Sequence, residues 1–332
     1  MRRLLLTFAL GAPLWAQADP ALVAKLAERF QPQTQAFTFA AIGDQQYGAE
    51  GEAKWPALAA SINAATALQF VAHMGDIKSG STRCDDALFE SRLQDFNKIA
   101  IPFILTPGDN EWTDCHRANN GAYDSLERLK KLREMFFAGE SSLGQRKIAL
   151  AKQSEDSRYP LYTENALFTH GGVVFATLHI VGSNNNLGRT PENDAEYKAR
   201  NQATLDWIRT AFALANANKF DSVVLMFQAD PEFPLLASGK NTTPAGFTDT
   251  LRVMLEESQA LGKPVLAIHG DSHFFRFDKP LARADGKVLD NFFRLEVPGE
   301  TDAHWVRVDV DPATAASPFR IQHITVAENA NR

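Results

Sequence analysis

The chain has 332 residues, of which 45% are hydrophobic and 22% are charged, and this composition excludes a disordered or fibrous protein. Its 34 basic and 40 acidic residues give a net charge of −6 at pH 7, and no basic run stands out, which argues against nucleic acid as the main partner. No apolar stretch approaches the roughly 18–20 residues that cross a bilayer, so we expect no membrane span.

The N-terminus, residues 1–18, is typical of a secretory signal peptide. Two arginines precede the apolar run 4–10, and the sequence Ala16-Gln17-Ala18 fits a small-x-small cleavage site. We therefore expect the protein to be secreted, with a bacterial periplasm as its destination.

Strand-like and helix-like segments alternate along the rest of the chain. Hydrophobic periodicity predicts strands at 36–42, 70–74 and 102–106, helices at 55–68, 85–99 and 123–137, and a polar excursion at 140–160. Further on it predicts a hairpin of 167–169 with 173–181 and a helix at 195–217 that is capped by Asn193 or Asp194. Strands at 222–227 and 264–268 follow, with a helix at 247–261 between them. The last predicted segments are β-rich, at 292–297, 305–310 and 319–326. Because no linker or repeat interrupts this alternation, we expect residues 19–332 to form one α/β domain with two sheets face to face and helices outside.

Cys84 and Cys115 are the only cysteines of the chain. In the oxidising compartment that a signal peptide implies, two cysteines usually pair. Each cysteine follows the end of a predicted strand by a few residues, so we expect a disulfide that joins two neighbouring loops. Two free thiols are the alternative, and the sequence has no pattern for structural zinc.

The dipeptide Gly-Asp occurs four times, each time at the end of an apolar strand: Gly43-Asp44, Gly75-Asp76, Gly108-Asp109 and Gly270-Asp271. Ligands of α/β sheets lie beyond the carboxyl ends of the strands, so we expect the four aspartates to converge. Carboxylates brought this close repel one another, and a metal centre between them would remove the repulsion. Polar residues near the strand ends extend the candidate set: Gln46, Asn110, Glu111, Gln228 and His273.

These motifs, in their order along the chain, resemble those of the calcineurin-like metallophosphoesterases. The family has Asp-x-His, Gly-Asp, Gly-Asn-His-Asp/Glu, a lone His and Gly-His-x-His; this chain has Gly43-Asp44-x-Gln46, Gly75-Asp76, Gly108-Asp109-Asn110-Glu111, Gln228 and Gly270-Asp271-Ser272-His273. Several ligand histidines are therefore replaced, as in a divergent member. The resemblance implies a four-layer α/β/β/α sandwich of two mixed sheets flanked by helices, with a dinuclear metal site at the strand ends.

The resemblance also implies a role for each candidate ligand. One metal ion would be bound by Asp44, Gln46, Asp76 and His273, and the other by Asp76, Asp109, Gln228 and Asp271. Four carboxylates would cancel the charge of two divalent ions and would weaken the attraction for phosphate. Because most of these ligands are oxygen atoms, we expect Mg²⁺, Mn²⁺, Ca²⁺ or iron rather than zinc.

The candidate catalytic and substrate-binding residues are more ambiguous. Asn110 stands where the family has a histidine beside the leaving group, and an amide cannot deliver a proton, which costs about 10²–10⁴ in rate. Glu111 either replaces that acid or caps the local backbone. Asn184 and Asn185 are candidate substrate-binding amides or a polar turn. Arg276 is a candidate phosphate contact within the run 274–277, which we otherwise expect in the strand core.

Together these features favour an exported phosphoesterase that hydrolyses a phosphate mono- or diester of a small molecule by metal-activated hydroxide, with activity that the substitutions impair. The alternatives are a non-catalytic relative whose acidic pocket binds a cation such as Ca²⁺ or another ligand, and glycoside hydrolysis by paired carboxylates. A nucleophilic Ser272 is disfavoured because no Gly-x-Ser-x-Gly motif exists. His73 and His179 lie within apolar strands and are expected in the core. The sequence leaves the oligomeric state open.

Overall fold

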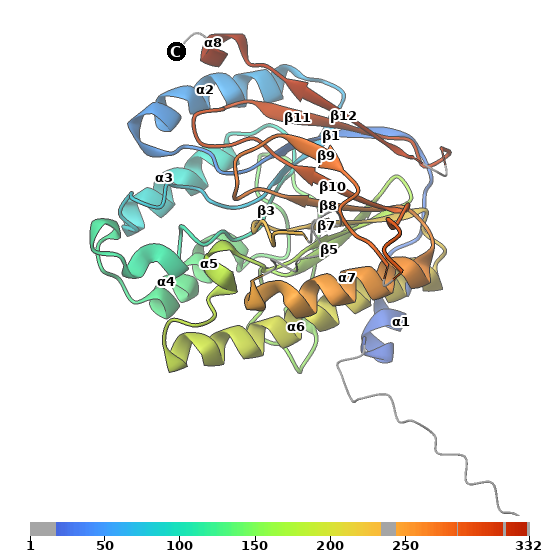
Figure 1. Ribbon diagram of the computed structural model, residues 1–332. Helices are drawn as coiled ribbons and strands as arrows, with labels where there is room; N and C mark the ends of the chain where they lie inside the picture. The colour runs from blue at the N-terminus through green and yellow to red at the C-terminus, as the bar shows by residue number, and fades with distance from the viewer. Residues whose placement is uncertain (1–17, 234–243, 284, 315–316, 331–332) are drawn as a thin grey trace, which may run out of the picture.

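The computed structural model of the chain describes residues 18–233, 244–283, 285–314 and 317–330. The predicted signal peptide, apart from its last residue, lies outside these ranges. Two sheets pack face to face, and helices cover the outer face of each sheet (Figure 1). Among the described residues, no helix combines the length and the apolar character that a membrane crossing requires.

The two sheets have five and seven strands, in the orders β12-β11-β1-β2-β3 and β4-β5-β6-β7-β8-β10-β9. Their bounds are β1 (Phe37–Ile42), β2 (Leu68–His73), β3 (Phe103–Leu105), β4 (Ala151–Lys152), β5 (Ala166–His170), β6 (Val173–Thr177), β7 (Ser222–Met226), β8 (Val265–His269), β9 (Arg276–Asp278), β10 (Phe292–Glu296), β11 (Trp305–Val310) and β12 (Phe319–Ile324). Both sheets are mixed: in the five-stranded sheet β1, β2 and β3 are parallel and β11 and β12 are antiparallel to their neighbours, and in the seven-stranded sheet β6, β7, β8 and β10 are parallel with antiparallel strands at both edges. The predicted hairpin is confirmed as β5 and β6.

Helices form the two outer layers. Their bounds are α1 (Pro20–Arg29), α2 (Gly48–Ala64), α3 (Asp86–Asn97), α4 (Ser125–Leu132), α5 (Gly182–Asn185), α6 (Pro191–Ala217), α7 (Thr248–Leu261) and α8 (Ala327–Ala330), with short 3₁₀ or π segments at Thr113–His116, Ala118–Asn120, Arg133–Phe137, Gln153–Glu155 and Ala245–Phe247. Apolar residues of α1, α6 and α7 pack on the seven-stranded sheet, and those of α2, α3 and α4 pack on the five-stranded sheet. The predicted α/β/β/α sandwich is confirmed.

Aromatic residues fill the space between the two sheets. The rings of Phe39 and Phe70 stack with their centroids 4.8 Å apart, and Phe175 of the other sheet meets the ring of Phe70 edge-on at 5.2 Å. All three side chains are buried, so this layer excludes water and fixes the two sheets against each other. The expected core position of His73 is confirmed, since its side chain is fully buried and burial lowers its pKa to about 3.

Three local predictions are wrong. Helix α2 begins at Gly48 instead of residue 55 and continues through Pro56, which lies in its interior. Helix α6 is capped by Thr190, whose hydroxyl accepts from the backbone N–H of Asn193, with a proline at the first helical positions. The run 274–277 is not strand core: Phe274 is 66% exposed, and only its last residues join the edge strand β9.

Candidate metal centre

The four Gly-Asp pairs lie at the carboxyl ends of β1, β2, β3 and β8, where the two sheets meet. Oxygen atoms of Asp76, Asp109 and Asp271 lie within 4.8 Å of one another. Asp44 lies beside them: both oxygens of the Asp44 carboxylate accept from the backbone N–H of Asp271 at 3.2 Å. The structure therefore brings all four aspartates together across the two sheets.

One oxygen of this group is left open. Among the described residues, Oδ1 of Asp109 has no hydrogen-bond partner, although the side chain is 94% buried (6% exposed). Its other oxygen accepts from the hydroxyl of Ser183 at 2.7 Å. A buried carboxylate oxygen without a donor is costly unless a cation approaches it, and carboxylates suit hard divalent ions. The donor set at Asp76, Asp109 and Asp271 therefore fits a metal ion.

The other carboxylates of the group are held by several donors. Asp76 accepts from the hydroxyl of Tyr47 at 2.8 Å and from the side-chain amide of Asn110 at 2.6 Å. Asp271 accepts from the side-chain amide of Gln228 at 3.0 Å and from the backbone N–H of Asp230 at 3.0 Å. These donors fix the direction of each carboxylate and leave further lone pairs for a cation.

Burial and mutual repulsion dominate the electrostatics of the group. Burial, followed by the charge of Asp109, raises the pKa of both Asp76 and Asp271 well above the usual range. Burial, followed by the charge of Asp114, raises the pKa of Asp109 to about 6. Lys78 is fully buried close to these carboxylates, and burial lowers its pKa to about 8 even though their charges oppose the change.

We expect the metal-free protein to lose stability as the pH rises from about 4 to 7. Burial holds the pKa of Asp109 at about 6 and that of Glu111 at about 7, so the folded chain keeps protons that the unfolded chain has already released. Folding is then favoured below the unfolded pKa and is progressively disfavoured as the pH passes the folded values. Urea unfolding of chelator-treated protein at several pH values checks this. The Asp109→Asn variant should show a smaller decline, and an equal or steeper decline would contradict the assignment.

Not every candidate residue is directed at this group. Gln46 donates its amide to Asp95 of α3 at 2.9 Å, and Arg276 forms an ion pair with Glu296 at 3.3 Å. Glu111 accepts from the backbone N–H groups of Gly108 and Asp76 at 2.6 and 3.2 Å, and so it contacts the loop backbone.

The amides of Asn184 and Asn185 also contact the protein itself. Asn184 accepts from the backbone N–H of Gly246 at 2.9 Å, and Asn185 accepts from the guanidinium of Arg200 at 2.6 Å. Both amides are therefore engaged with groups of the protein itself.

Several residues near the acidic group were not singled out from the sequence, among them Tyr47, Lys78 and Ser183. Tyr47 and Lys78 follow the Gly-Asp pairs of β1 and β2 by a few positions, which is the only sequence signal that points to them. The hydroxyl of Ser183 lies between Asp109 and Asp114, at 2.7 and 2.9 Å.

The backbone around the centre is strained. Non-glycine residues at the strand ends adopt left-handed conformations, with φ of 52° at Asp44, 55° at Asp76, 79° at Asp271 and 65° at His273. Each such residue costs of the order of 1–3 kcal/mol, and such strain concentrates at functional sites. It persists here because both sheets fix the ends of these loops.

Gly182 allows the close approach of two carboxylates. A Cβ atom on this residue would lie 2.8 Å from Oδ2 of Asp109 and 2.8 Å from Oδ1 of Asp271. We therefore expect Gly182→Ala to displace both side chains and to weaken metal binding about 10–100-fold. Calorimetric titration with Mn²⁺ measures the change. Gly139→Ala is the matched control, because nothing lies within 4 Å of its Cβ position, and its affinity should stay within about 2-fold. Equal affinities of the two variants would contradict the assigned position of the ion.

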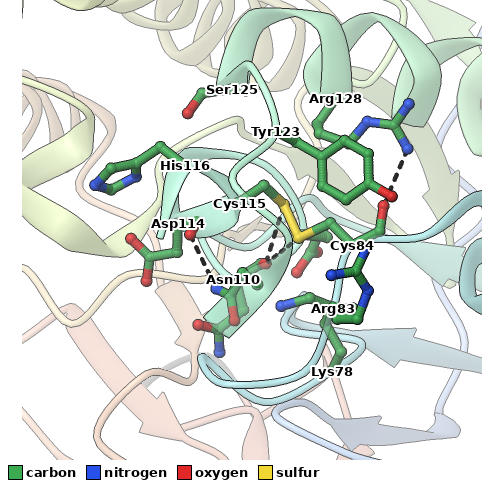
Figure 2. Close-up of a disulfide and its surroundings, with 12 residues drawn as sticks. Lys78, Arg83, Cys84, Asn110, Asp114, Cys115, His116, Tyr123, Ser125 and Arg128 are labelled. Atoms are coloured by element: carbon green, nitrogen blue, oxygen red, sulfur yellow. Dashed lines mark hydrogen bonds between the residues drawn. A yellow bond between two sulfur atoms is a disulfide. The ribbon is translucent and has the colours of Figure 1, made fainter. Parts of the chain in front are cut away.

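A disulfide links the loops that follow β2 and β3, so the predicted pairing of Cys84 with Cys115 is confirmed. Figure 2 shows the disulfide beside Asn110, and both sulfur atoms lie 3.6 Å from the backbone carbonyl oxygen of that residue. Since the side chain of Asn110 donates to Asp76, the disulfide supports one wall of the acidic group.

Searches against protein-family models and against curated proteins found no match. Solved structures do match. The chain superposes on a purple acid phosphatase from yellow lupin (Lupinus luteus) with a TM-score of 0.53 and 11% identity over 90% of this chain. It superposes on the 5′-nucleotidase of Candida albicans with a TM-score of 0.51 and 12% identity over 90% of this chain. The chain therefore shares the fold of these two structures. The matched region spans 53% of each of these two structures, about half their length.

Proposed function

We propose that this chain is an exported, metal-dependent phosphoesterase that hydrolyses a phosphate mono- or diester of a small molecule. The observation that carries the proposal is the group of Asp76, Asp109 and Asp271 at the strand ends, with one buried oxygen of Asp109 that no described residue donates to. The shared fold supports it, because the two similar structures bear the names of a phosphatase and a nucleotidase.

The residues present define what the chain itself contributes. An ion held by the three carboxylates would polarise a phosphoryl oxygen and lower the pKa of a water molecule. Gln228 and Ser183 orient Asp271 and Asp109 through hydrogen bonds. Asn110 can donate a hydrogen bond to a phosphoryl oxygen but cannot protonate a leaving group. Esters with good leaving groups, such as aryl phosphates, should therefore react best.

A second candidate function is cation binding without catalysis. The observation that favours it is Asn110, whose amide donates to Asp76 and to the hydroxyl of Tyr47. This residue occupies the position at which the resembling family has a histidine beside the leaving group, and an amide cannot act as a general acid there. In that case the chain would bind a divalent ion with the same carboxylates and would leave phosphate esters intact.

One experiment separates the two functions. Chelator-treated mature protein is supplied with Mg²⁺, Mn²⁺, Ca²⁺ or Fe²⁺ and assayed with p-nitrophenyl phosphate and bis(p-nitrophenyl) phosphate, while metal binding is measured in parallel. We expect metal-dependent hydrolysis that Asp109→Asn abolishes and Gly139→Ala preserves. Metal binding without hydrolysis of either ester supports the cation-binding function, and absence of both overturns both functions.

Export is the remaining part of the proposal. It rests on the signal peptide predicted at residues 1–18, and the disulfide supports it because disulfides persist in oxidising compartments. Expression of the full chain in a bacterium, followed by fractionation and N-terminal sequencing, should yield periplasmic protein that begins at Asp19. Unprocessed protein confined to the cytoplasm would contradict it.

A further inference from the structure

The residues that the family resemblance assigns to the first of two metal ions do not form a complete ligand set. Gln46, which stands at a ligand position, donates its side-chain amide to Asp95 at 2.9 Å, and its backbone carbonyl accepts from Arg92 at 3.2 Å. Both contacts direct this residue toward α3. The Oε1 atom of Gln46 has no hydrogen-bond partner among the described residues, but Asp44 and His273 fall outside the group of side chains whose ligand atoms lie within 4.8 Å of one another.

The hydroxyl of Tyr47 lies beside Asp44 and Asp76, two of the ligands that the resemblance assigns to the first ion. The hydroxyl of Tyr47 is 2.8 Å from Oδ2 of Asp76 and 3.4 Å from Oδ1 of Asp44, so it lies between the two carboxylates. It also accepts from the side-chain amide of Asn110 at 2.9 Å. The ring of Tyr47 meets the imidazole of His273 edge-on, with centroids 5.4 Å apart. A neutral donor therefore fills the space between the two carboxylates.

The remaining groups of this half-site also have partners. Asp44 is fully buried, and its two oxygens accept from the backbone N–H of Asp271 at 3.2 Å. His273 lies between two carboxylates, with Nε2 3.6 Å from Asp44 and Nδ1 3.4 Å from Glu300. In this half-site, hydrogen bonds and ion pairs thus stabilise the charge of the carboxylates, as a bound ion would otherwise do.

The other half-site keeps its three implied carboxylate ligands. Asp76, Asp109 and Asp271 present oxygens within 4.8 Å of one another, and Oδ1 of Asp109 has no donor among the residues that the structure describes. Gln228 is fully buried and bridges this half to the neighbouring loop, since it accepts from the backbone N–H of Gly182 at 2.6 Å and donates to Asp271 at 3.0 Å. The open oxygen of this half belongs to a carboxylate, whereas the open oxygen of the first half, Oε1 of Gln46, belongs to a neutral amide.

We propose that the chain binds a single divalent ion through Asp76, Asp109 and Asp271, and that Tyr47 and His273 take the place of a second ion. The inference rests on the proposed metal-dependent function, but it concerns the number of ions and not the reaction. It also assigns Tyr47 as a positioning residue that holds Asp76 and Asn110 in place.

The number of bound ions tests the inference directly. Chelator-treated mature protein is titrated with MnCl₂ by calorimetry, and bound Mn²⁺ is examined by electron paramagnetic resonance. We expect one ion per chain, with the six-line spectrum of an isolated Mn²⁺. Two ions per chain with a spin-coupled spectrum would overturn the inference and leave the proposed function intact. No Mn²⁺ bound to folded protein would overturn both.

Two matched variants test the assignment of the ligands. Asp44→Asn and Asp271→Asn each replace a buried strand-end aspartate that follows a glycine, and circular dichroism verifies that each variant folds. We expect Asp271→Asn to weaken Mn²⁺ binding at least about 100-fold, more than the loss of an outer contact would, while Asp44→Asn changes it less than about 3-fold. Comparable losses in the two variants would overturn the assignment.

The Tyr47→Phe variant tests whether the hydroxyl of Tyr47 positions Asp76 or binds a metal ion. This variant removes the donor to Asp76 and keeps the ring. We expect it to bind one Mn²⁺ per chain, like the wild type, with a changed kcat and an unchanged number of ions. Loss of one of two ions in this variant would identify Tyr47 as a ligand and overturn the inference.

Discussion

Replacing Asp76 by asparagine is expected to abolish metal binding and hydrolysis together. The carboxylate of Asp76 lies within 4.8 Å of that of Asp109 and contacts the hydroxyl of Tyr47, and its amide analogue would keep the shape but lose the negative charge that attracts the cation. We expect metal affinity to fall at least about 100-fold, beyond the range seen for outer contacts of metal sites. Calorimetric titration with Mn²⁺ and an aryl phosphate assay measure the two effects.

The metal-free Asp76→Asn protein should also be more stable than the metal-free wild type. Burial and the neighbouring carboxylates raise the pKa of Asp76 well above its usual range, so its ionised form destabilises the folded state. Thermal unfolding in a chelator checks this part. Gln46→Ala is the control, because the amide of Gln46 contacts Asp95 and not the acidic group. Full metal binding by Asp76→Asn, together with a loss in Gln46→Ala, would refute the position of the centre.

Removal of the disulfide should cost the protein a large part of its stability. Cys84 and Cys115 are separated by 31 positions, and closing a loop of this length stabilises the folded state by about 3–4 kcal/mol in the loop-entropy treatment. The double variant Cys84→Ala, Cys115→Ala should lower the free energy of unfolding by about this amount in urea titrations. Its metal affinity should also fall, because both sulfur atoms contact the backbone carbonyl of Asn110.

Wild-type protein treated with a reductant is the control for the loss of the cross-link without a change of side chains. Its unfolding free energy should fall toward that of the double variant. A thiol titration of denatured, unreduced protein should find no reactive cysteine. Two reactive thiols, or a reduced protein as stable as the oxidised one, would contradict the structural role of the disulfide.

Much of the fold and the convergence of the aspartates could be predicted because the signals are local. Each Gly-Asp pair follows a short apolar run with at most two residues between them, and a strand end in a parallel sheet has only one edge at which its loop can lie. The cysteine pairing followed from the same strand ends. These predictions need only the position of a residue along the chain.

Predictions that depended on side-chain direction were less successful. Asp44 and Gln46 both adopt left-handed φ, of 52° and 61°, and these turns direct Tyr47 instead of Gln46 toward Asp76. No periodic pattern encodes such a turn, because the packed sheets impose it. The exposure of Phe274 has the same origin, since His273 before it is also left-handed.

The acidic group draws its members from both sheets, with Asp76 and Asp109 after strands of one and Asp271 after a strand of the other. A bound ion would therefore link the two sheets through their carboxylates. The unfolded chain would have no such binding site. The binding energy of the ion adds directly to the stability of the fold, by about 2.7 kcal/mol at a free ion concentration of 100 times Kd. A melting curve recorded over a series of ion concentrations thus reports the affinity of the centre, even before any substrate is known.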